Sequence, residues 1–227
     1  MANLVYLSAE DYARVSAAVS AAEADTFGEI VTVLADRSDG YSDVALAWAA
    51  GASFAALTAL AIAPDFYLGL AERLTGGWIV EWTPREILEL AALVAMLKFA
   101  AMLLLQLWQP LKFLLIPGQI RTARVHDRAV RAFRIGAERR THGRTGVLIY
   151  LSMREHRAEI LADEAIASQV PPEVWGDSMV ALLAEVKAGR LADGMIAAVE
   201  RVGAVLAEHS PAGGENPNEL PDRLIEV

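Results

Sequence analysis

The chain has 227 residues, 55% of them hydrophobic, and a formal net charge of −9. This apolar share exceeds that of an ordinary soluble domain, so we expect a segment that does not belong to a soluble core. The absence of cysteine excludes disulfides, thiol catalysis and cysteine-bound zinc. The opening residues include no basic region and only a short apolar one, so we expect no secretory signal peptide.

The N-terminal residues predict a helix followed by a buried strand. Ser8 is placed as an N-cap, and apolar residues at helical spacing follow it over residues 9–24. Gly28 interrupts this pattern, and residues 29–35 are almost continuously apolar and rich in β-formers. Such a strand is buried on both faces and is not stable alone, so it needs strand partners from elsewhere in the chain.

Two long apolar segments come next and predict a transmembrane hairpin. Residues 44–63 carry no charge, and residues 87–108 carry only Glu89 and Lys98. As a helix, each segment would reach about 30 Å, which is the thickness of the hydrocarbon core of a bilayer. Tryptophans cluster in or beside both segments, as aromatic residues do at membrane interfaces. The alternative is a pair of buried core helices, which rarely need such long uncharged runs.

A basic stretch follows the second apolar segment. Four of its arginines recur at helical spacing: Arg121, Arg124, Arg128 and Arg131. Beside a membrane span, such residues are suited to anionic lipid headgroups, and they also act as topological determinants. Nucleic acid is disfavoured as a partner, because no aromatic residues interleave with the basic ones as they do in nucleic-acid motifs.

Lys98 lies near the middle of the second apolar segment, where a charge is costly. Three possibilities compete: the side chain snorkels to an interface, it faces the first apolar helix, or it pairs with a carboxylate on another chain. Because the hairpin offers no obvious acidic partner, we predict that Lys98 marks an intermolecular contact.

The C-terminal half supplies the missing strand partners. An amphipathic helix is predicted over residues 125–140, followed by a β-hairpin with strands at 146–152 and 157–162. Both strands are apolar on both faces, so we expect helices to cover both faces of a small mixed sheet. Helices are further predicted over residues 164–170, 174–188 and 191–208.

An even number of spans places the two ends of the chain on the same side of the membrane. We therefore predict one soluble α/β domain, split by the hairpin and reassembled from both ends. Its first part comprises residues 1–42, the hairpin with a short external loop residues 43–117, and its second part residues 118–210. Residues 211–227 form a polar tail whose apolar end could dock back.

Four stretches outside the hairpin resemble the TPM-domain family, and in particular its bacterial membrane branch. They are "LSAEDYARVSAAVSAAEADTFGEIVTVLADRSDGY", "HGRTGVLIYLSMREHRAEILADEAIASQVPPEVW", "AGRLADGMIAAVERVGAVLAEH" and "NELPDRLIEV". Each stretch is a weak signal alone, but as a set they are specific and cover nearly all of the chain outside the hairpin.

The resemblance implies a fold, a TPM-like αβα sandwich, here interrupted by the two-helix hairpin. It also implies activities that differ between members: weak acid phosphatase activity and calcium binding in some, and assembly or protection of membrane complexes in others. Typical members are exported and keep the domain whole beside a single anchor. This sequence departs from them on both points, so a lumenal or extracytoplasmic role is not expected.

Carboxylates near the ends of the predicted strands are the candidate metal ligands, because ligands collect where strands of an α/β sheet terminate. Glu29, Glu155 and Asp163 form this candidate set, and calcium is the candidate ion, since it takes several oxygen ligands. The competing interpretation is structural, with Glu155 as a solvated turn residue and Asp163 as a helix N-cap. No catalytic residue is assigned, because the sequence contains neither HExxH nor GxSxG.

Three hypotheses about function remain open. The first is a membrane-anchored module that binds a protein partner or a metal ion during membrane complex assembly or quality control. The second is a weak metal-dependent phosphatase-like hydrolase, and the third is a structural subunit that acts through its hairpin. The expected partners are membrane lipid and a membrane protein, with homo-oligomerisation as a further option. The expected location is the bacterial inner membrane, with both termini in the cytoplasm.

Overall fold

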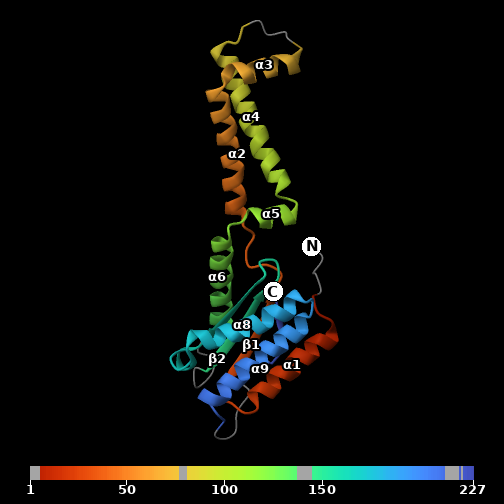
Figure 1. The fold of residues 1–227 in the computed structure, drawn as a ribbon, viewed down its shortest axis with the longest axis vertical. Helices are drawn as coiled ribbons and strands as arrows, with labels where there is room; N and C mark the ends of the chain where they lie inside the picture. Colours follow the sequence, from red (N-terminus) through yellow and green to blue (C-terminus); the bar gives the residue numbers. More distant parts are fainter. Residues whose placement is uncertain (1–5, 77–80, 137–144, 213–219, 221) are drawn as a thin grey trace. The chain divides into compact units, whose positions relative to one another are not determined.

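The computed structural model of the chain describes residues 1–227 except 1–5, 77–80, 137–144, 213–219 and 221 (Figure 1). The chain divides into two compact units. The first, which we call the α/β unit, consists of Met1–Asp39 and Gly118–Val227, and the second, the hairpin unit, is Gly40–Pro117. The α/β unit is thus built from both ends of the sequence.

A mixed sheet with strand order β3-β2-β1-β4 forms the centre of the α/β unit. Its strands are β1 (Glu29–Ala35), β2 (Gly146–Ser152), β3 (Arg157–Ala162) and β4 (Ile225–Glu226). β1 pairs in parallel with β2, from Glu29 opposite Gly146 to Ala35 opposite Ser152. β3 returns antiparallel to β2, and the short β4 runs parallel to β1. The predicted pairing of the N-terminal strand with the C-terminal hairpin is confirmed.

Helices cover both faces of this sheet, as the apolar strands predict. One face packs against α1 (Ala9–Glu23), α8 (Pro172–Lys187) and α9 (Leu191–His209), through a core that includes Ile30, Leu34 and Ile149. The other face packs against α6 (Gly118–Gly136), through Val31, Leu148 and Tyr150. Alternate residues of each strand thus enter different cores. The α/β sandwich with a small mixed sheet is confirmed, and its layers are visible in Figure 1.

Capping residues fix the starts of several helices of the α/β unit. Ser8 and Asp11 form a complete capping box at the start of α1, and Asp163 is the N-cap of the short α7 (Glu164–Ala167). α6 begins at Gly118, directly after Pro117 and earlier than the predicted residue 125. The end predicted for that helix, residues 137–140, lies outside the described residues.

The end of the chain joins the sheet. Val227 donates its N–H to the Leu34 carbonyl at 2.9 Å, and its carbonyl accepts the Asp36 N–H at 3.2 Å. Leu220 and Leu224 are buried. The described part of residues 211–227 is therefore docked along β1, so the edge of that strand is covered where it meets β4.

The hairpin unit contains α2 (Ser42–Ile62), α3 (Pro64–Thr75), α4 (Pro84–Leu105) and α5 (Gln109–Leu115). α2 and α4 pack side by side, and the Ser53 hydroxyl donates to the Ala95 carbonyl at 2.9 Å. α4 begins at Pro84, ahead of the predicted residue 87, because Thr83 and Glu86 form a capping box there. It ends at Leu105, and Pro110 lies in the first turn of the next helix.

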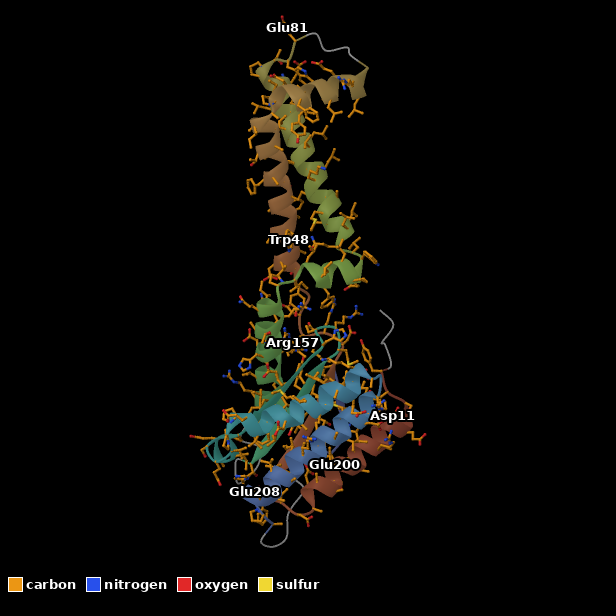
Figure 2. All side chains as sticks on the ribbon, viewed as in Figure 1. Asp11, Trp48, Glu81, Arg157, Glu200 and Glu208 are labelled. Atoms are coloured by element: carbon orange, nitrogen blue, oxygen red, sulfur yellow. The ribbon has the colours of Figure 1, made fainter. Side chains whose placement is uncertain are left out.

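Both long helices of the hairpin unit have the length and apolar composition of a membrane span. Their side chains contribute little to any core: only Val44 and Ala49 of α2 are buried, and no residue of α4 is. Figure 2 shows the side chains that project from these helices. The hairpin unit therefore exposes apolar surface along almost its whole length.

Candidate functional site

The carboxyl ends of β1 and β2 carry a cluster of polar side chains. Because the two strands are parallel, the loop that follows β1 and the turn that follows β2 meet at one edge of the sheet, which is where α/β folds commonly bind ligands. The backbones stay paired past the strands, since Met153 donates to the Ala35 carbonyl at 2.9 Å and Arg154 to the Asp36 carbonyl at 3.0 Å. We call this cluster the β-edge cluster; its members are Asp36, Ser38, Tyr150, Ser152, Arg154 and Glu155.

Glu155 is the central acceptor of the β-edge cluster. Its side chain is only 2% exposed, and its two oxygens accept hydrogen bonds from the Ser152 hydroxyl at 2.5 Å and from the Ser38 N–H at 3.0 Å. The Ser38 hydroxyl donates in turn to Ser152 at 2.9 Å and lies 3.1 Å from the Tyr150 hydroxyl. The alternative interpretation of Glu155 as a solvated turn residue is therefore not what the structure shows.

A second part of the β-edge cluster is an ion pair. The Arg154 Nε lies 3.0 Å from each carboxylate oxygen of Asp36, and the Tyr6 hydroxyl donates to the same carboxylate. Burial alone would raise the pKa of Asp36, but the hydrogen bonds from Tyr6 and Arg154 hold that pKa below its usual value. Burial and the bond to Asp36 raise the pKa of Tyr6 to about 12, so Tyr6 is a proton donor at neutral pH.

The four arginines predicted to meet lipid headgroups all lie on α6, but the structure gives them different surroundings. Arg124 forms an ion pair with Asp39 at 3.1 Å, and Arg131 donates to the Asp127 carbonyl at 3.1 Å. The charge of Arg128 lies near the buried Tyr150 hydroxyl, where it opposes the rise in the Tyr150 pKa that burial causes. The Nε of Arg121 is buried and has no hydrogen-bond partner among the described residues.

The three carboxylates predicted as metal ligands do not lie together. Glu29 begins β1 opposite Gly146, and Asp163 donates its N–H to the Gly146 carbonyl at 2.8 Å, so both lie at the amino ends of β1 and β2. Glu155 lies beyond the carboxyl end of β2, a seven-residue strand away, which is about 20 Å. Across the described residues, no group of three His, Asp or Glu side chains is placed to hold a metal ion.

Each of the two carboxylates at the amino ends has a structural contact of its own. The Glu29 side chain is 1% exposed and accepts the Leu220 N–H at 3.1 Å. Asp163 accepts the Glu164 N–H at 2.8 Å as the cap of α7. The contact of Asp163 agrees with its structural interpretation as a helix N-cap, for which the sequence offered no counterpart at Glu29.

Glu23 is a buried ionisable residue that the sequence pattern did not reveal. It ends the amphipathic helix α1, a position that is ordinarily solvated, yet it is 6% exposed and accepts the Ile30 N–H at 2.6 Å. Burial raises its pKa to about 8; the bond from Ile30 opposes the shift, and the charges of Glu29 and Asp222 add to it. Glu23 is therefore held largely as the neutral acid near neutral pH.

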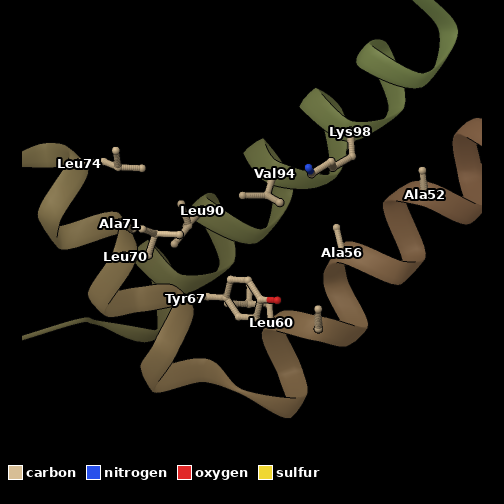
Figure 3. Close-up of a pocket in the computed structure, with 11 residues that line it drawn as sticks. Ala52, Ala56, Leu60, Tyr67, Leu70, Ala71, Leu74, Leu90, Val94 and Lys98 are labelled. Carbon is tan, nitrogen blue, oxygen red and sulfur yellow. The ribbon is translucent and has the colours of Figure 1, made fainter. Parts of the chain in front are cut away.

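Lys98 lies in a groove of the hairpin unit, far along α4 from the capped start of that helix. The groove has a volume of about 540 Å³ and is lined by α2, α3 and α4 (Figure 3). Its walls are apolar apart from Lys98 and the Tyr67 hydroxyl. The structure thus places the predicted intramembrane lysine at a concave surface of its own hairpin.

Comparison with known proteins identifies the C-terminal part of the α/β unit. Residues 118–205 match the model of the TPM domain. The chain is also similar to the BA42 protein from the psychrophilic bacterium Bizionia argentinensis, solved by NMR, with 18% identity, a TM-score of 0.57 and coverage of 100% of both chains. At this identity the similarity concerns the fold alone. The chain matches no curated protein sequence.

The resemblance to the TPM family is thereby confirmed for residues 118–205, and the assignment to its bacterial membrane branch stays a prediction. The matched residues run from the start of α6 into α9, and they include β2, β3 and the Glu155 turn of the β-edge cluster. α1 and β1 lie outside the match, but the structure shows that β1 pairs with β2 along its whole length. The N-terminal segment therefore completes a domain whose recognisable part lies beyond the hairpin.

Proposed function

We propose that this chain is a membrane-anchored binding protein. In this proposal α2 and α4 cross a membrane, and the TPM-like α/β unit binds a protein partner at the membrane surface through the β-edge cluster. The observation that carries the proposal is the exposure of two long apolar helices that contribute almost nothing to a core.

Exposed apolar side chains along α2 and α4 support insertion. Large side chains such as Phe54, Ile62, Leu88 and Leu104 are between 65% and 79% exposed. Monomeric soluble proteins rarely expose contiguous apolar surface on this scale, because each Å² costs about 25 cal/mol in water. In the hydrocarbon core of a bilayer the same surface is favourable.

The polar groups of the two helices are also arranged as a membrane requires. The single proton of the Ser53 hydroxyl has the Ala95 and Ala49 carbonyls within hydrogen-bond distance, and the Thr58 hydroxyl donates to the Phe54 carbonyl. Hydroxyls in hydrocarbon need internal partners of this kind. Trp48 and Trp108 lie toward the same end of the hairpin, where interfacial aromatics are expected, and the Trp48 Nε1 donates to the Leu115 carbonyl at 2.9 Å.

We place the spans in the bacterial inner membrane, and charge asymmetry supports an orientation with both termini in the cytoplasm. Arg37 precedes the first span, and Lys112, Arg121 and Arg124 follow the second. The loop between the spans has only Arg73 and Arg85 as basic residues. Positive residues favour the cytoplasmic side, so the α/β unit belongs there. Arg121 is the strongest headgroup candidate of the four arginines, because it follows the second span most closely in the sequence.

The geometry of the β-edge cluster favours binding over metal-dependent hydrolysis. Ser38 and Ser152 already hydrogen bond to each other and to Glu155, and the predicted metal carboxylates lie at opposite ends of the sheet. These contacts hold the partly exposed side chains of Asp36, Ser38 and Arg154 in fixed positions that a partner can recognise, whereas metal hydrolysis requires converging ligands.

Membrane extraction tests the proposed anchor. After alkaline carbonate washing of cell membranes, we expect the chain to stay in the pellet. A variant with Phe54→Arg and Leu97→Arg places two charges on exposed faces of the spans, and we expect it to shift into the supernatant or to be degraded. Glu200→Arg, on the exposed surface of α9, is the matched control and should stay in the pellet. Release of the unmodified chain by carbonate would contradict the proposal.

A further inference from the structure

The groove of the hairpin unit has a regular lining. α2 lines it at helical spacing with Ala52, Ala56, Ala59 and Leu60, and α4 lines it with Leu90, Val94 and Lys98. α3 contributes four further residues, from Tyr67 to Leu74. Residues spaced in this way form ridges along a helix surface, and two such ridges border a channel into which the ridge of a third helix can pack. The small alanines on one wall allow the backbone of that helix to approach closely.

Lys98 brings an unpaired charge to this groove. Its ammonium group has no hydrogen bond or ion pair within the described part of the chain, and Figure 3 shows its Nζ directed toward Val94, into the groove. Lys98 is about 10 Å along the helix from Leu105, the nearer end of α4, and its side chain points away from that end. The side chain is therefore aimed at the groove rather than at the nearer interface.

We infer that the groove receives a transmembrane helix of a different membrane protein, which places an Asp or Glu carboxylate against Lys98. This inference rests on the proposed insertion of the hairpin in a membrane. Within hydrocarbon, a lysine is stabilised by pairing with an opposite charge, and the groove supplies the concave apolar surface that a helix carrying that charge would fill.

A second copy of this chain is a poorer occupant for a geometric reason. Copies inserted by the same route share one orientation, so equal residues lie at equal depth. Residues 44–63 and 90–108 contain no carboxylate. Glu89 is the nearest acidic residue on α4, about 13 Å away along the helix, and it is paired with Arg85 at 2.8 Å. No copy of the hairpin can therefore present a carboxylate at the depth of Lys98.

A lipid headgroup is a poorer occupant as well. A phosphate at Lys98 would lie about 10 Å inside the span, measured from Leu105, which removes it from water and from the headgroup layer. A carboxylate on a helix reaches this depth without strain, because its backbone is already satisfied by internal hydrogen bonds.

Designed peptides test the inference with the full-length protein. The protein is labelled with a fluorescence donor and inserted in zwitterionic vesicles, and acceptor-labelled transmembrane peptides of Leu and Ala carry Glu, Gln or Leu at their centre. We expect the Glu peptide to bind at least tenfold more tightly than the Leu peptide. Lys98→Leu should abolish that preference, and Lys98→Glu should transfer it to a peptide with a central Lys.

Two further variants separate the shape of the groove from its charge. Ala56→Leu fills the groove and should weaken binding of every peptide, whereas Lys187→Leu removes an exposed lysine of the α/β unit and should change nothing. Equal binding of the Glu and Leu peptides, or a preference that survives Lys98→Leu, would overturn the inference. The inference would also be overturned if Lys98→Leu changed only the amount of anionic lipid that co-purifies with the protein.

Insertion is measured separately by flotation of the vesicles. Protein that floats with the vesicles but shows no preference for the Glu peptide refutes the groove partner and leaves the proposed anchor intact. Protein that fails to float refutes both.

Discussion

The Ser152 hydroxyl donates to the Glu155 carboxylate at 2.5 Å, inside the turn that joins β2 to β3. The other oxygen of the same carboxylate accepts the Ser38 N–H from the loop that follows β1. The hairpin unit separates these two segments in the sequence. One buried side chain therefore ties together the two parts of the split domain at its proposed binding edge.

Removing this carboxylate should destabilise the α/β unit. Glu155→Ala leaves the Ser38 N–H without its acceptor in a partly buried site, which costs about 1–3 kcal/mol. We expect a lower midpoint of urea unfolding in detergent. The fluorescence of Trp175 reports unfolding once the other tryptophans, all between residues 40 and 117, are replaced by Phe. Glu155→Gln retains an acceptor and should lose less stability. Glu200→Ala, at an exposed position, is the control; an effect as large as that of Glu155→Ala would contradict the assignment.

The sequence predicted the positions of the two strands around this turn, but not the role of Glu155 within it. Strands β2 and β3 begin and end at the predicted residues, because their apolar runs are bounded by charged and glycine residues. Glu155 is buried against Ser38, which belongs to a loop that precedes the hairpin unit in the sequence. A turn of four charged or polar residues gives no signal of such a partner, so only the assembled fold distinguishes a buried carboxylate from a solvated one.

Glu23 should make the stability of the α/β unit depend on pH. Its pKa is raised from 4.5 to about 8 in the folded chain, so the folded state binds the proton more tightly than the unfolded state does. The stability that this provides is fully present below pH 4.5 and is lost as the pH rises through 8. We expect the free energy of unfolding to fall over this window in the unmodified chain.

Glu23→Gln should remove that part of the slope, because an amide keeps an acceptor for the Ile30 N–H and does not titrate. The same urea assay, repeated between pH 4.5 and 8, measures the difference. Glu10→Gln, an exposed residue of the same helix, is the matched control and should keep the slope of the unmodified chain. Parallel curves for Glu23→Gln and the unmodified chain would refute the assignment.

The contact between α1 and α9 should tolerate no added methyl group at Gly203. A Cβ built there would lie 2.6 Å from the Cβ of Ala22 and 3.2 Å from its Cα, so the two helices would have to separate. We expect Gly203→Ala to lower the free energy of unfolding by about 1–3 kcal/mol. Gly176→Ala, in α8, meets nothing within 4 Å and should be neutral or stabilising, since alanine favours a helix. The reverse order of stabilities would show that this packing is wrong.

The hairpin illustrates the other limit of sequence reasoning. Composition alone located both apolar helices, because an apolar run of this length with at most two charges is typical of a membrane span and rare in a soluble core. It did not locate the groove, because that depends on which faces of α2 and α4 turn toward α3. Lys98 was conspicuous as a charge in an apolar run, but its direction follows from the helix geometry, in which side chains lean toward the N-terminus.

Arg121 should contribute more to the recognition of anionic lipid than Arg124 does. Arg121 follows the second span most closely in the sequence, whereas Arg124 is already paired with Asp39. Each free basic residue near a membrane surface is worth about 1 kcal/mol. We expect Arg121→Gln to reduce the anionic lipid retained by the purified protein in mixed micelles about fivefold, and Arg124→Gln to have a smaller effect. Equal effects would assign the binding to the net charge of α6 rather than to Arg121.

The orientation of the hairpin can be tested by cysteine labelling, because the chain has no cysteine of its own. Glu81, between α3 and α4, and Glu208, in α9, are both accessible enough for a cysteine at either position to react (Figure 2). If α2 and α4 span the inner membrane with the α/β unit in the cytoplasm, an impermeant maleimide should label Glu81→Cys in intact cells and leave Glu208→Cys unlabelled. Both variants should be labelled once detergent opens the membrane. The opposite pattern would invert the topology, and would place the basic residues after the second span outside, against the usual bias.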